Sequence, residues 1–163
     1  MREALKFLRT GRVAPFAGVT WPEPGGWLAP DVHGILPEAL AVWIAEELWS
    51  VELDDAEEVV PGVLAAARGR LLARVEGWDD AAAREFARAC AERARDGATG
   101  RAAEYAADAT AAAERATAGP AAALVGYMAA HAAEAKAPGS FATERRRQSL
   151  WLAERLGLSP SAE

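Results

Sequence analysis

The chain has 163 residues, of which 52% are hydrophobic and 26% charged, and its formal net charge is −6. This balance is typical of one globular domain, and the acidic net charge excludes an ordinary basic nucleic-acid-binding protein. A single cysteine excludes an intramolecular disulfide and a multi-cysteine metal site. No apolar run has the length of a membrane span or a signal peptide, so we expect a cytoplasmic protein without membrane contact.

The first 35 residues are predicted to form short strands around a loop. Residues 20–30 contain three prolines, two glycines and two tryptophans, a composition typical of a loop. Ordering such a loop requires buried side chains, so we expect Trp21 and Trp27 to anchor it. Pro15 places the second strand at a sheet edge. Strands are expected at residues 5–8, 12–18 and 32–35.

A helix and further strands are predicted next. Pro37 is suited to the first turn of a helix, and the apolar stripe that follows predicts a helix continuing to Leu48. Residues 49–53 alternate between apolar and polar side chains, the pattern of a half-buried strand. Residues 59–60 and 63–64 are expected to pair across Pro61-Gly62. Residues 69–76 suit a strand better than a helix.

Four helices are predicted after Trp78. Asp79 or Asp80 is a suitable N-cap for the first helix, which ends near Gly97. Glycine and proline residues separate the others. The remaining helices are expected at residues 99–117, 120–135 and 141–156.

Alanine dominates these helices, and it supplies 42 of the 163 residues. A buried alanine stabilises far less than a buried leucine, which contributes about 1.5–3 kcal/mol. The helix at 99–117 therefore packs at close approach through alanine faces, is loosely held, or forms a homodimer contact.

These elements predict an α+β fold. A small N-terminal antiparallel sheet with one helix occupies residues 1–78, and a bundle of three to four alanine-rich helices packs on it over residues 79–158. The last five residues, 159–163, are expected to be a disordered tail.

His33 is the strongest catalytic candidate, because histidine titrates near neutral pH. Asp31 and Glu47 are the carboxylates that could assist it in acid–base chemistry. The alternative is a half-buried histidine bonded only to backbone. Only two histidines are present, about a hundred positions apart, so no metal site and no cofactor is predicted.

Aromatic residues are the candidates for ligand contact. Trp21, Trp27 and Trp43 could wall a flat ligand or anchor a partner protein. His131 lies on an apolar helical stripe, where a core position is the simpler interpretation. Cys90 is interpreted as a small core residue. Residues 145–147 are three arginines, expected to pair with the acidic N-terminal part.

A set of short segments carries a recognisable pattern along the chain. These segments are Lys6-Phe7-Leu8, Pro15-Phe16-x-Gly18-x-x-Trp21-Pro22, Gly26-Trp27, Val32-His33, Leu36 to Trp43, Glu47-Leu48-Trp49-x-Val51-Glu52-Leu53 and Arg147-Gln148-Ser149-x-Trp151-Leu152-Ala153-x-Arg155-Leu156-Gly157-Leu158. Together they resemble a group of uncharacterised actinobacterial proteins. Members of that group often carry Ala-Cys after the histidine, where this chain has Gly34-Ile35. The resemblance covers most of the chain, and it implies a shared fold without an activity.

Two classes of function are consistent with these observations. The first, which we favour, is a non-catalytic module that binds a small hydrophobic molecule or a partner protein. The second is a small cofactor-independent enzyme that acts on a hydrophobic metabolite, with His33 as general acid or base.

Overall fold

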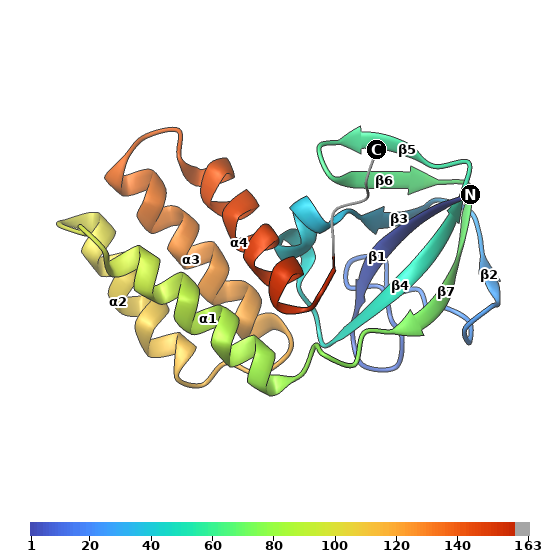
Figure 1. The fold of residues 1–163 in the computed structure, drawn as a ribbon, viewed down its shortest axis with the longest axis horizontal. Helices are drawn as coiled ribbons and strands as arrows, with labels where there is room; N and C mark the ends of the chain where they lie inside the picture. The colour runs from blue at the N-terminus through green and yellow to red at the C-terminus, as the bar shows by residue number, and fades with distance from the viewer. Residues whose placement is uncertain (159–163) are drawn as a thin grey trace.

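The computed structural model describes residues 1–158 and shows a mixed α+β fold, with a sheet on one side and a helical bundle on the other (Figure 1). The tail expected at 159–163 lies outside the described residues. The strands are β1 (Arg2–Leu8), β2 (Trp27–Leu28), β3 (Val32–Ile35), β4 (Glu47–Asp54), β5 (Glu57–Val60), β6 (Val63–Ala66) and β7 (Arg68–Arg74). The helices are η1 (Pro37–Trp43), α1 (Asp80–Arg95), α2 (Arg101–Ala113), α3 (Pro120–Lys136) and α4 (Phe141–Arg155).

The sheet is larger than the small sheet predicted from the sequence. Its seven strands follow the order β2-β7-β4-β1-β3-β6-β5, and every pairing is antiparallel. β1 is paired with β4 along the whole length of β1, from Arg2 opposite Leu53 to Leu8 opposite Glu47. The expected pairing across Pro61-Gly62 is confirmed as β5 against β6, and the predicted strand at 69–76 is β7.

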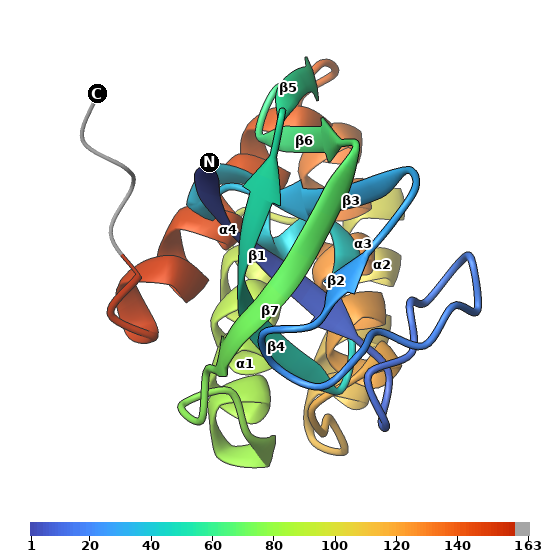
Figure 2. The same ribbon diagram turned by 90° about the vertical axis from the view of Figure 1, so that its right-hand side faces the viewer.

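The sheet buries apolar side chains on both faces. One face, including Leu5 and Phe7 of β1, packs against η1 and the helices. The other face, including Ala4 and Leu8 of the same strand, packs around Trp21. The alternation along β1 follows from strand geometry, in which successive side chains point to opposite faces. Figure 2 shows the helices behind the strands.

The predicted helix up to Leu48 is wrong in its length and type. The segment is a 3-10 helix that ends at Trp43, and β4 begins at Glu47. Leu48 fits the apolar stripe of a helix, but in the fold it pairs with Phe7 of β1. Strand pairing in the sheet therefore overrides the local helical pattern.

The predicted strand at 12–18 is also wrong. This segment is a tight loop in which the Ala14 carbonyl accepts the Gly18 N–H, and only isolated bridges join Val13 to Arg9 and to Thr20. The loop at 20–30 contains one short strand, β2, that sequence reasoning did not expect. Trp21 anchors this loop as predicted, because it is only 2% exposed.

The four C-terminal helices lie close to their predicted bounds. Asp79 caps α1, and its carboxylate accepts the Ala82 N–H at 2.8 Å. α2 is shorter than expected and ends at Ala113.

Alanine faces hold α2 in the bundle. Its buried residues are all alanines, and they belong to the same core as the alanines of α1 and α3. These alanines are covered by the chain's own helices, and the homodimer contact considered from the sequence stays a prediction. The buried alanines of α2 are Ala102, Ala106, Ala109 and Ala113.

Gly126 allows the close approach of α3 to its neighbours. A Cβ at this position would lie 3.0 Å from Gln148 Oε1 and 3.3 Å from Phe86 Cζ. Gly126→Ala is therefore expected to lower the free energy of unfolding by about 1–3 kcal/mol through overpacking. Glycine-to-alanine changes inside helices otherwise stabilise by about 1 kcal/mol. Urea denaturation gives the sign, and a more stable variant would show that this contact is not tight.

Candidate ligand-binding site

The site lies where β1 and β3 separate. The two strands share one paired position, Leu5 opposite Ile35. Continued antiparallel pairing would place Phe7 opposite His33. Instead, Lys6, Phe7 and His33 line a pocket that opens between the strands.

The pocket has a volume of about 340 Å³ and a mainly apolar lining. This volume is within the range of small-molecule sites, which is about 300–1,000 Å³. Phe16 is 83% exposed, and its ring meets Trp43 edge-on with 6.4 Å between centroids. The lining residues supplied by loops and η1 are Ala14, Pro15, Phe16, Ala17, Asp31 and Trp43.

Lys6 is the central polar group of this pocket. Its Nζ lies 5.8 Å from the centroid of the Trp21 ring and 5.9 Å from that of Trp43. Within residues 1–158 the amine has no hydrogen bond or ion pair with another residue. Burial lowers the pKa of Lys6 from 10.5 to about 8, because the charged form loses solvation. The amine is therefore available to a ligand in both its charged and its neutral form at physiological pH.

His33 and Asp31 both line this pocket, but the pocket is open to solvent, whereas the sequence-based hypothesis required a closed one. His33 is half-buried and lies on β3 opposite Ala65 of β6. Asp31 precedes β3 and is exposed, with a left-handed φ of 58° that aspartate tolerates better than most residues. The pocket thus has two groups that can exchange protons beside one amine.

Trp43 is held in the pocket wall by contacts between η1 and α4. Ala41, two residues earlier, donates its N–H to Ser149 Oγ at 2.9 Å. The carbonyl of Ala41 accepts a hydrogen bond from Arg145 Nη2 at 2.8 Å. Arg145 therefore bonds to the backbone of η1 and to Gln148, not to an N-terminal carboxylate as predicted.

Glu47 does not belong to the pocket. Its carboxylate is 8% exposed, and it accepts the Gly11 N–H and the Trp49 Nε1–H, each at 3.0 Å. These two bonds satisfy a buried carboxylate and fix the turn after β1. The proposed catalytic role of Glu47 is therefore replaced by a structural one.

Trp27 and His131 also lie away from the pocket. Trp27 is on β2, where the guanidinium groups of Arg68 and Arg70 lie 4.4 Å and 4.9 Å from its ring centroid. His131 on α3 packs among three aromatic rings that share the surface of α2, α3 and α4. These are Tyr105, Tyr127 and Phe141.

Sequence reasoning missed Lys6 as a functional residue. The chain contains 16 arginines and only two lysines, Lys6 and Lys136. The counts set lysine apart from arginine but do not say which lysine matters, and a single lysine in a strand forms no motif.

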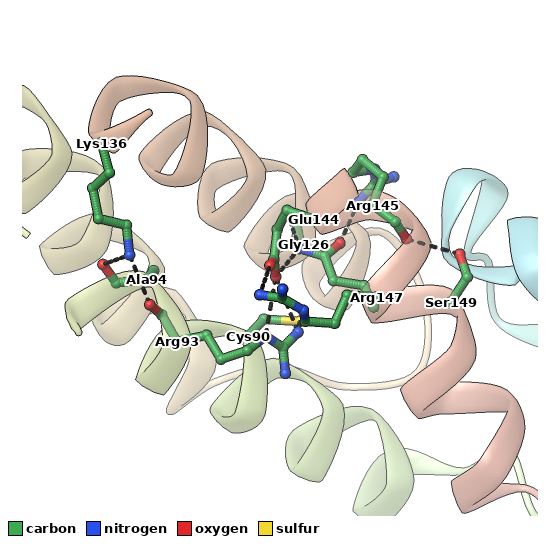
Figure 3. A network of polar contacts seen from close by, with 10 residues as sticks. Cys90, Arg93, Ala94, Gly126, Lys136, Glu144, Arg145, Arg147 and Ser149 are labelled. Atoms are coloured by element: carbon green, nitrogen blue, oxygen red, sulfur yellow. Dashed lines mark hydrogen bonds and ion pairs between the residues drawn. The ribbon is translucent and has the colours of Figure 1, made fainter. Parts of the chain in front are cut away.

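A second polar cluster joins α1, α3 and α4 but has a structural role (Figure 3). Glu144 of α4 is 5% exposed and accepts two bonds from the guanidinium of Arg93 on α1. Gln148 donates to the Gly126 carbonyl of α3 at 2.9 Å. Burial raises the pKa of Cys90 to about 12, so this thiol is a core residue and no nucleophile.

Acidic side chains gather in a hollow at the base of α1, and two of them are bonded to backbone groups. Asp79 caps α1, while Asp80 accepts the Ala118 N–H at 2.9 Å. No group of three or more metal-ligating side chains in residues 1–158 is arranged to hold a metal ion. None of the described helices is long and apolar enough to cross a membrane.

No family model matches the chain, and neither a curated protein nor a solved structure gives a match. The resemblance to the actinobacterial group therefore stays a prediction. The functional argument is drawn from the geometry of the Lys6 pocket.

Proposed function

We propose that this protein binds a small, mainly apolar molecule whose oxygen-bearing group, a carboxylate or a carbonyl, contacts the amine of Lys6. The observation that carries the proposal is an amine without an internal partner in an apolar pocket of about 340 Å³. Lys6 is half-buried, and an amine that lacks a protein partner at an apolar cavity is a natural contact for an oxygen-bearing ligand.

The tryptophans favour a small molecule over a partner protein. Trp21 is buried in the core, and Trp27 is covered by two arginines. The ring of Trp21 is therefore not presented to an approaching protein. Trp43 and Phe16 instead offer an aromatic edge-to-face wall to a flat ligand in the pocket.

Benzoate is expected to bind this pocket more tightly than benzamide at neutral pH. The two probes have nearly the same shape, but only benzoate is an anion that the charged form of Lys6 attracts. Amide resonances followed by NMR should shift at the three parts of the pocket, which are β1, the loop at 14–17 and β3. Lys6→Met should remove the preference for benzoate.

Two tryptophan variants test where the probe binds. Trp43→Ala should weaken benzoate binding, while Trp27→Ala should leave it unchanged, because Trp27 lies on β2 away from the pocket. Resonance shifts centred on the aromatic surface of α2, α3 and α4 would contradict the proposal. Equal effects of the two alanine variants would contradict it as well.

A cofactor-independent enzyme is the second candidate function. The favouring observation is that His33 and Asp31 line the same pocket as Lys6. In this alternative His33 is the general acid or base that acts on a bound hydrophobic metabolite, and Asp31 assists it.

A further inference from the structure

We propose that the ligand is an aldehyde and that Lys6 holds it as a reversible imine in the pocket between β1 and β3. This inference rests on the proposed function and names the class of its ligand. Three features carry it: an amine without a partner, an aromatic wall, and two groups that can exchange protons lining the same cavity.

Lys6 has a larger neutral, nucleophilic fraction than an ordinary lysine. No carboxylate of residues 1–158 is paired with it, and the loss of solvation outweighs the attraction of its ammonium to the two tryptophan rings. With a pKa of about 8, roughly a tenth of the amine is neutral at neutral pH. An ordinary lysine has a far smaller neutral fraction at this pH, and the neutral amine is the form that attacks a carbonyl.

The reaction needs no oxidant, reductant or metal. The nitrogen lone pair of Lys6 attacks the carbonyl carbon and a C–N bond forms; nitrogen loses one proton and the oxygen gains one, which gives a carbinolamine. The carbinolamine hydroxyl then accepts a proton and leaves as water while the nitrogen lone pair forms the C=N bond. Loss of the remaining N–H proton gives the neutral imine and returns the proton that the hydroxyl accepted. His33 and Asp31 line the cavity and can exchange these protons.

The side chains that line the pocket determine which kind of aldehyde can bind. Phe16 and Trp43 present rings, and Ala14 and Pro15 present small apolar groups. A flat aromatic aldehyde can stack on these groups while its carbonyl points to Lys6. A strongly charged or sugar-like aldehyde would lose solvation here without gaining partners.

Lys136 provides an internal comparison. Its ammonium donates to the carbonyls of Arg93, Ala94 and Asp96 at the end of α1, at 2.9–3.3 Å. These bonds use the proton-bearing form of the amine and occupy it. Of the two lysines in the chain, Lys6 is therefore the one expected to form an imine, whereas Lys136 is hydrogen-bonded to the end of α1.

Reductive trapping with benzaldehyde and sodium cyanoborohydride tests the proposal on the intact protein. At neutral pH the mass of one benzyl group should be added to Lys6 at least about tenfold faster than to Lys136. Trypsin cleaves after Arg2, so the amine of Met1 and that of Lys6 fall on different peptides. His33→Gln should slow the addition at Lys6 severalfold, because proton transfer to the leaving hydroxyl is lost.

Lys6→Arg separates this inference from the proposed function, because the variant keeps a positive charge but forms no imine. It should still bind benzoate and gain no benzyl group at position 6. Equal labelling of Lys6, Lys136 and Met1 in the wild type would overturn the imine while leaving benzoate binding intact. Absence of both benzoate binding and Lys6 labelling would overturn both proposals.

Discussion

Glu144→Ala is expected to lower the free energy of unfolding by about 3 kcal/mol. The Glu144 carboxylate is 5% exposed and accepts bonds from Arg93 and Gln148. Its removal leaves the Arg93 guanidinium, which is 26% exposed, without its charge partner in a packed groove. Removing one member of a buried ion pair costs about 3–5 kcal/mol, and the partial exposure of Arg93 places this case at the low end.

Glu85→Ala is the matched control for this prediction. Glu85 also pairs with an arginine of another helix, Arg155, but both side chains are well exposed, at 48% and 41%. Exposed ion pairs add little stability, so the loss should be a small fraction of that for Glu144. Urea unfolding of the two variants at equal salt makes the comparison. Equal losses of unfolding free energy in the two variants would mean that the buried Glu144 network stabilises the fold no more than a surface ion pair does.

The Glu144 network also connects the bundle to the ligand pocket. Gln148 of α4 bonds to Glu144, and Arg145 bonds to both Gln148 and the Ala41 carbonyl of η1. η1 carries Trp43 into the pocket wall. Helices far along the chain therefore position a binding side chain near its beginning, which no local sequence pattern could indicate.

The elements that sequence reasoning predicted well are those whose signals are local. α1 follows a capping aspartate, and β5 and β6 flank Pro61-Gly62, so their existence could be read from neighbouring residues. The segment from Ile44 to Leu48 could not be assigned from its neighbouring residues, because its apolar spacing suits both a helix and a strand. The long pairing with β1 decides between them, and that pairing joins residues about forty positions apart.

The residues that line the candidate pocket were also predicted only in part, because some of them stand out by type alone and others only in the folded chain. His33, Asp31 and Trp43 stood out by residue type, and they do meet at one pocket. Glu47 also stood out, but its partners Gly11 and Trp49 emerge only after β1 and β4 pair. Lys6 was hidden because a single lysine in a strand has no motif; its isolation from other charges is a property of the folded chain.

Lys6→Met is expected to raise the free energy of unfolding by about 2 kcal/mol at neutral pH. The lowered pKa of Lys6 corresponds to an unfavourable desolvation of the charged amine on the order of 3 kcal/mol. Attraction to the two tryptophan rings, near the outer limit of about 6 Å for such contacts, offsets roughly 1 kcal/mol of it. Methionine has a similar length and no charge, so it avoids this cost.

The pH dependence of the same variant tests the cause of its stability. Below about pH 8 the amine is charged in both states, and its full cost is present in the wild type. Between about 8 and 10.5 the folded protein has released the proton that the unfolded chain still binds, so wild-type stability rises. The advantage of Lys6→Met should therefore shrink over this range and level off above it.

Lys136→Met is the control, because the amine of Lys136 is hydrogen-bonded whereas that of Lys6 is desolvated and has no hydrogen-bond partner. It removes three bonds to the end of α1 and should lower the free energy of unfolding. A loss of stability in Lys6→Met as well would mean that the cation holds Trp21 and Trp43 together and serves the fold. A gain confined to Lys6→Met identifies a lysine that destabilises the folded protein, and this is expected of a residue whose amine serves a ligand.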